Sequence, residues 1–183
     1  MLSKQKEKSF IFVDCKICTM RIVSGILLLL SLLVSSCTNK QDNIVIFREF
    51  ENQEWERFEY LNGSFNIDKD SQKYDVIMEV VVNESYPNIY EAHQSDCPLL
   101  FNLTIKNPDG NGGRSRDYKF MLKDKDGNWK ADNKNGYYTF KLPIMGGVSF
   151  SEKGVYNFKI ENKYPKDPLY GIKSIKIECV TTK

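Results

Sequence analysis

Period-two alternation of apolar and polar residues is the feature that most constrains the fold of this chain. It is clearest in the segment 154–162, where Tyr156, Phe158 and Ile160 are separated by polar residues. Successive side chains of a β-strand point to opposite faces, so such a segment has one apolar and one polar face. Eight strand-like segments, rich in Val, Ile, Tyr and Phe and separated by turn signals, can be read: 44–50, 56–67, 74–83, 99–107, 116–124, 136–144, 154–162 and 171–180.

Strands with one apolar face predict two antiparallel sheets packed face to face, because each apolar face must be buried against another layer. No segment shows a sustained helical spacing of apolar residues. We therefore predict an all-β antiparallel sandwich of about eight strands, immunoglobulin-like or jelly-roll-like, over residues 44–181. We expect the following side chains to be largely buried: Phe101, Leu103, Tyr156, Phe158, Ile160, Ile175 and Ile177.

A short apolar run precedes this domain and ends close to a cysteine. Residues 22–34 are too few to span a membrane, which takes about 20 apolar residues, but they suit the core of a signal peptide. The following tail "LVSSC" (33–37) resembles the bacterial lipobox, and the resemblance implies cleavage before Cys37 and lipidation of its thiol. The alternative is an ordinary secretory signal in which Cys37 is incidental.

The segment before the domain therefore divides into three parts. Met20 begins a complete lipoprotein signal, so we expect residues 20–36 to be the signal peptide and 1–19 to be an extension from a wrongly assigned gene start. Residues 37–43 are expected to be the lipidated cysteine with a polar tether. The expected lipids are a diacylglycerol and an N-acyl chain such as palmitate on Cys37, with no other cofactor. They would anchor the protein in the cell membrane or outer membrane, facing the periplasm or the cell surface.

The charge pattern argues against nucleic acid as a partner. The whole chain has a formal net charge of +2, but five basic and two acidic residues precede Cys37, so the rest carries about −1. Charges of both signs alternate along this part, whereas a nucleic-acid-binding domain shows a basic stripe.

The cysteines indicate no redox motif in the mature part. Cys15 and Cys18 form a C-x-x-C, but they lie in the expected extension. Cys97 and Cys179 could pair in an oxidising envelope, or they could be one loop thiol and one buried thiol.

No catalytic or metal-binding constellation is evident, and we expect a protein that is not an enzyme. His93 is the only histidine. A Cys97–His93 pair is conceivable, but a solvated loop histidine is the simpler reading. The segment 124–135 begins like a calcium loop, yet its twelfth position is Asn135 instead of the bidentate Glu that such a loop needs, so we read "DGN" as a turn.

Four short patterns in the mature part resemble a known family. They are an early aromatic pair, a D-G-x-W turn, an F-x-x-x-G-x-Y-x-F-x-I strand and a closing G-I segment. The matching residues are Trp55, Phe58, Asp126, Gly127, Trp129, Phe150, Gly154, Tyr156, Phe158, Ile160, Gly171 and Ile172. With the lipobox, this pattern is similar to the gliding-motility lipoprotein H (GldH) family of Bacteroidota over about 130 residues.

The resemblance implies a lipid-anchored β-sandwich of the cell envelope that is associated with gliding machinery. We expect a non-enzymatic component that contacts the membrane through its anchor and binds other envelope or motility proteins. Our first candidate for the partner-binding segment is the loop between Asn83 and Pro98, with Tyr86, Tyr90 and His93. The alternative function is glycan binding by exposed aromatic side chains at the surface or in the periplasm.

Overall fold

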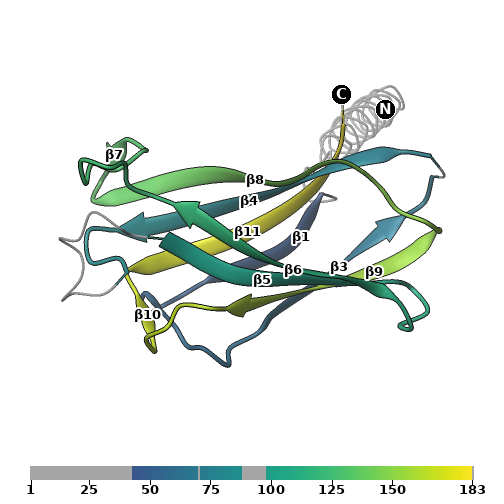
Figure 1. Cartoon of the computed structure of the whole chain (residues 1–183), viewed down its shortest axis with the longest axis horizontal. Helices are drawn as coiled ribbons and strands as arrows, with labels where there is room; N and C mark the ends of the chain where they lie inside the picture. The colour runs from purple at the N-terminus through teal and green to yellow at the C-terminus, as the bar shows by residue number, and fades with distance from the viewer. Residues whose placement is uncertain (1–42, 70, 88–97, 183) are drawn as a thin grey trace, which may run out of the picture. The chain divides into compact units, whose positions relative to one another are not determined.

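The computed structural model describes residues 43–69, 71–87 and 98–182, which form eleven strands and, in these ranges, no helix (Figure 1). All strand pairs are antiparallel. The described ranges contain no helix that could cross a membrane. The predicted all-β antiparallel sandwich is thereby confirmed, and the strand count rises from about eight to eleven because three further strands have only two residues each.

Two sheets form the layers of the domain (Figure 1). The larger has five strands in the order β1 (Ile44–Glu49), β11 (Ile172–Thr181), β4 (Lys73–Asn83), β8 (Tyr137–Ser149) and β7 (Asn133–Lys134). The smaller has four, in the order β3 (Leu61–Ile67), β9 (Gly154–Asn162), β5 (Pro98–Lys106) and β6 (Gly113–Met121). A separate two-stranded ribbon pairs β10 (Leu169–Tyr170) with β2 (Glu54–Trp55).

One hydrophobic core lies between the two sheets. Alternate residues of β5 are buried, as are those of β9, so each strand turns one apolar face inward. All seven side chains expected to be buried are at most 2% exposed, which confirms the predicted core. Trp55, on the ribbon, is fully buried as well.

Three predicted strands differ from the observed ones by three residues or more, and one of them, 136–144, runs on to Ser149 in β8. The expected strand 56–67 begins only at Leu61, because the backbone N–H of Glu59 donates to the carbonyl of Glu56 (3.1 Å) and makes a turn. The indole N–H of Trp55 donates to the carbonyl of Glu59 (2.8 Å), which fixes that turn against the core. The expected strand 116–124 is shifted to Gly113–Met121, and beyond it Lys123 forms only an isolated bridge with Trp129 across the turn at residues 124–127.

The two sheets approach one another closely where β1 passes β3. A Cβ added at Gly63 would lie only 1.9 Å from the carbonyl oxygen of Val45, so no larger residue fits there without moving the backbone. Glycine at this position therefore sets the distance between β1 and β3.

Candidate functional site

The D-G-x-W residues form a structural turn. The Asp124 carboxylate accepts hydrogen bonds from the backbone N–H groups of Asp126 and Asn128, both at 2.9 Å, and Gly127 has a φ of +83°. The hydrogen bond from the backbone of Asn128 is the main cause that holds the pKa of Asp124 below its usual range. Within the described ranges no group of His, Cys, Asp and Glu is arranged to hold a metal ion.

Trp129 completes the motif by packing on a neighbouring strand. Its ring stacks on Tyr138 with a centroid distance of 4.5 Å, and the ammonium of Lys123 lies 4.5 Å from the indole centroid. Glu84 accepts hydrogen bonds from the indole N–H (3.3 Å) and from the Tyr138 hydroxyl. The hydrogen bond to Glu84 also raises the pKa of Tyr138. The tryptophan thus ties the turn to β8 through stacking and a shared carboxylate.

Tyr86 is not an exposed contact residue, contrary to the sequence-based expectation. Its side chain is 0% exposed, and its hydroxyl donates to the carbonyl of Pro98 at 3.0 Å. A Cβ added at Gly171 would lie 2.4 Å from the backbone nitrogen of Tyr86, so the backbone passes close to Gly171 at this point. The other two residues proposed for this loop, Tyr90 and His93, lie outside the described residues.

The cysteine predictions remain open. Cys179 is 0% exposed on β11, and burial raises the pKa of its thiol to about 12, so it is inert in the folded state. Its suggested partner Cys97 and the lipidation site Cys37 both lie outside the described residues, so the disulfide and the lipid stay predictions.

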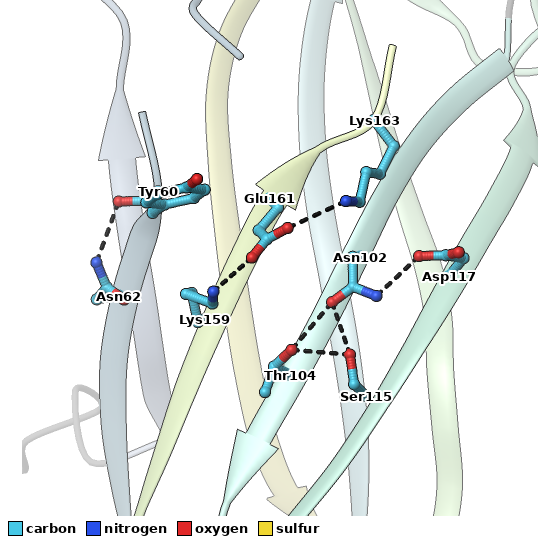
Figure 2. A network of polar contacts seen from close by, with 9 residues as sticks. All are labelled: Tyr60, Asn62, Asn102, Thr104, Ser115, Asp117, Lys159, Glu161 and Lys163. Carbon is cyan, nitrogen blue, oxygen red and sulfur yellow. Dashed lines mark hydrogen bonds and ion pairs between the residues drawn. The ribbon is translucent and has the colours of Figure 1, made fainter. Parts of the chain in front are cut away.

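Figure 2 shows a network of polar side chains on the outward face of the four-stranded sheet. The side-chain oxygen of Asn102 on β5 accepts hydrogen bonds from the hydroxyls of Thr104 (3.0 Å) and Ser115 (2.9 Å). Its amide N–H donates to the carboxylate of Asp117 on β6 at 2.8 Å. Each of these side chains therefore has a hydrogen-bond partner within the network, which connects β5 and β6.

The neighbouring strand β9 carries a compact ionic cluster on the same face (Figure 2). Glu161 accepts hydrogen bonds from the ammonium groups of Lys159 and Lys163, the latter at 3.1 Å. The hydrogen bond from Lys159 is the main cause that lowers the pKa of Glu161, and the same bond raises the pKa of Lys159. The centre of this face is therefore polar, paired and nearly neutral in charge.

An exposed aromatic patch lies beside this network, and we define it as Phe47, Phe58 and Tyr60. They are 63%, 75% and 45% exposed and make up three of the four large exposed hydrophobic side chains of the described ranges. Phe47 and Tyr60 line one pocket of about 310 Å³, and Tyr60 and Phe58 line another of about 380 Å³. Tyr60 is thus shared by two adjoining hollows, and Lys159 holds its ammonium 4.9 Å from the ring centroid.

Sequence reasoning missed this patch because Phe47 and Phe58 fall within segments that look like core strands. One signal was present. Val45, Ile46 and Phe47 are consecutive apolar residues, and a strand cannot turn all three inward. The register of β1 shifts between Ile44 and Ile46, so Val45 and Ile46 are both buried and Phe47 faces solvent.

These features define a class of protein: an all-β, two-sheet domain whose exposed features are a sheet face and an aromatic patch. Residues 45–178 match the GldH lipoprotein family, and the chain belongs to this family. The match confirms the resemblance drawn from the sequence, and membership implies a membrane-anchored protein of the cell envelope.

Two solved structures show a remote likeness, and no curated protein matches the sequence. One is a family GH115 4-O-methyl-alpha-glucuronidase with specificity for decorated arabinogalactans, with 10% identity and a TM-score of 0.38 over 68% of this chain. The chain spans only 14% of the length of that enzyme. The other comes from work on CBM4 structure and function, with 9% identity, a TM-score of 0.32, and coverage of 79% of this chain and 82% of that one. At these scores neither carries an argument about function.

Proposed function

We propose that this protein is a non-enzymatic, lipid-anchored component of the cell envelope that binds another envelope protein through its aromatic patch. The main support for this proposal is the exposure of Phe47, Phe58 and Tyr60 around two adjoining pockets. Large apolar side chains gathered on a soluble surface are costly to leave in water, and such patches are typical of contact sites.

The surroundings of the aromatic patch suit a protein interface. Aromatic and arginine side chains carry most of the energy at interface centres, and a polar rim excludes water around them. Arg48 lies beside the patch in an ion pair with Glu59 at 2.5 Å, and the Lys159–Glu161 pair lies on its other side. A stable interface buries roughly 1,200 Å² or more, so the partner would cover part of the rim as well.

Family membership supports a place in gliding-type machinery, and the partner we propose is accordingly another envelope or motility protein. The anchor we propose is Cys37 with its lipids. The domain would then be held at the membrane by residues 37–43 and would present the aromatic patch to its partner.

The aromatic patch can be tested by substitution in intact cells. We expect the triple variant Phe47→Ser, Phe58→Ser, Tyr60→Ser to lose the specific crosslinked product that the wild-type lipoprotein gives, because the anchor rings of the interface are gone. The domain should still fold, since these side chains contribute little to the core. The measurement is chemical crosslinking followed by immunoblotting of the protein.

The matched control is Val155→Ser, because Val155 is the fourth large exposed hydrophobic side chain of the described ranges and lies outside the patch. This variant should keep the crosslinked product. An unchanged product in the folded triple variant would rule out the patch as the contact site. Turnover of a polysaccharide, peptide or ester by the purified protein would overturn the non-enzymatic part of the proposal.

The anchor makes a separate prediction. We expect Cys37→Ala to abolish metabolic labelling with palmitate and to move the protein, once its signal segment is removed, from the membrane fraction to the soluble fraction, because the acylated thiol is the proposed anchor. Labelling of the wild type is the positive control. Membrane retention without labelling in the wild type would show that Cys37 carries no lipid.

Glycan binding is the second candidate, and one observation favours it. The Tyr60 ring is 45% exposed beside a polar sheet face, and an exposed aromatic ring offers a flat surface on which a sugar ring can stack (Figure 2). Saturable binding of a purified envelope polysaccharide that Tyr60→Ser abolishes would favour this function over a protein contact.

A further inference from the structure

Strand β6 is an open edge of the four-stranded sheet. The sheet order ends at β6, and within the described ranges this nine-residue strand pairs only with β5. Every second residue of an edge strand turns its N–H and C=O groups away from the sheet, and these groups can pair with another extended chain. Gly113–Met121 contains no proline, so the row of outward groups is uninterrupted.

This edge carries an excess of unpaired positive charge. Arg114, Arg116 and Lys119 are all exposed, and none forms an ion pair with a residue in the described ranges. The one carboxylate of the strand, Asp117, accepts a hydrogen bond from Asn102. By contrast, Lys159 and Lys163 on the same sheet share Glu161. The positive charge of β6 is thus left available to a partner.

A column of stacked rings accompanies the charge. Tyr118 and Phe120 are half-buried, and their ring planes are within 2° of parallel. Both stack on Phe101, with centroid distances of 5.3 Å and 6.2 Å. The guanidinium of Arg116 extends the column 5.5 Å from the Tyr118 centroid. A strand added beside β6 would set its alternate side chains against this column.

We propose that the β6 edge binds an extended, acidic segment of a partner protein, which adds a fifth strand to the smaller sheet. The open backbone groups supply affinity, and the three cations select carboxylates. A second copy of this chain fits poorly, because both edges would carry the same excess of positive charge and a β6–β6 pair centred on Asp117 would set two carboxylates opposite each other.

The β6 edge is separate from the aromatic patch. β3, which is flanked by Tyr60, and β6 are the two ends of the same sheet order, so the two surfaces belong to opposite edges. One domain could then hold two partners, and substitutions at one edge should leave binding at the other unchanged.

The test uses the full-length lipoprotein in detergent and fluorescein-labelled nine-residue peptides, with binding followed by fluorescence anisotropy. The first peptide alternates Glu and Val, the second alternates Lys and Val, and the third is the acidic peptide N-methylated at consecutive central residues, so that both of its edges lose donors. We expect the acidic peptide to bind at least about tenfold more tightly than the lysine peptide. N-methylation should weaken it by a similar factor, because it removes backbone donors from both edges that could pair with β6.

A variant with the three positive charges of β6 reversed tests the same edge from the side of the protein. Arg114→Glu, Arg116→Glu, Lys119→Glu changes only exposed side chains, so the thermal midpoint should stay close to that of the wild type. This variant should lose the acidic peptide and gain the lysine peptide, whereas the Phe47, Phe58 and Tyr60 variant should bind as the wild type does. Equal binding of the acidic and N-methylated peptides would show ionic attraction without strand addition and overturn the proposal. Unchanged affinity after charge reversal would overturn it as well.

Discussion

We expect Phe158→Ala to lower the free energy of unfolding by about 3–5 kcal/mol. Phe158 is 1% exposed on β9 and lies in the core between the two sheets. Truncation removes its apolar surface from the core and leaves a cavity that the surrounding strands can only partly fill. Since a domain is stable by about 5–15 kcal/mol, this loss would bring it close to unfolding. Chemical denaturation followed by the fluorescence of buried Trp55 measures the change.

Phe58→Ala is the matched control, because the same substitution is made where the ring is 75% exposed. Its cost should stay within about 0.5 kcal/mol, as is usual for surface changes. Equal losses at the two positions would show that Phe158 does not lie in the core described.

The second large effect is expected at Gly171, which has a φ of +73°. A Cβ there would lie 2.4 Å from the backbone nitrogen of Tyr86 and 2.7 Å from the side-chain oxygen of Asn83. Gly171→Ala therefore combines an unfavourable backbone conformation with a collision against backbone, and we expect a loss of about 3 kcal/mol or more. The measurement is again the free energy of unfolding from chemical denaturation.

Gly136→Ala separates the two causes. Gly136 has a φ of +83°, but nothing lies within 4 Å of an added Cβ. The control should thus lose only the conformational part, about 1–2 kcal/mol. If both variants lost the same amount, the contact between Gly171 and Tyr86 would have no energetic weight.

Much of the fold was predictable because apolar and polar residues alternate with period two along most of the strands. The segment 154–162 was predicted to its exact bounds, and the buried residues of β5 and β9 follow from alternation alone. The order of strands in each sheet was not predictable, since pairing depends on contacts between distant segments. The two-residue strands β2, β7 and β10 are too short to show any period.

The candidate site was harder to predict, for a physical reason. Tyr86 and Phe58 are both aromatic residues near turns, and sequence alone does not say which ring is buried. The structure buries Tyr86, whose hydroxyl donates to the carbonyl of Pro98, and leaves Phe58 in solvent on the turn of residues 56–59, which the indole of Trp55 fixes. Long-range packing therefore decides which apolar residues remain for a partner.

The position of β1 determines how the domain responds to a pulling force. β1 is the first described strand, it pairs along its length with β11, and β3 approaches it closely at Gly63. In the proposed anchoring, tension between the membrane and a bound partner enters the domain at Ile44. A pull along the axis of β1 loads all its inter-strand hydrogen bonds in parallel, so that they must break together, whereas a pull across the axis opens them one after another. The direction of the pulling force, more than its magnitude, would then decide whether the tethered domain stays folded or unfolds.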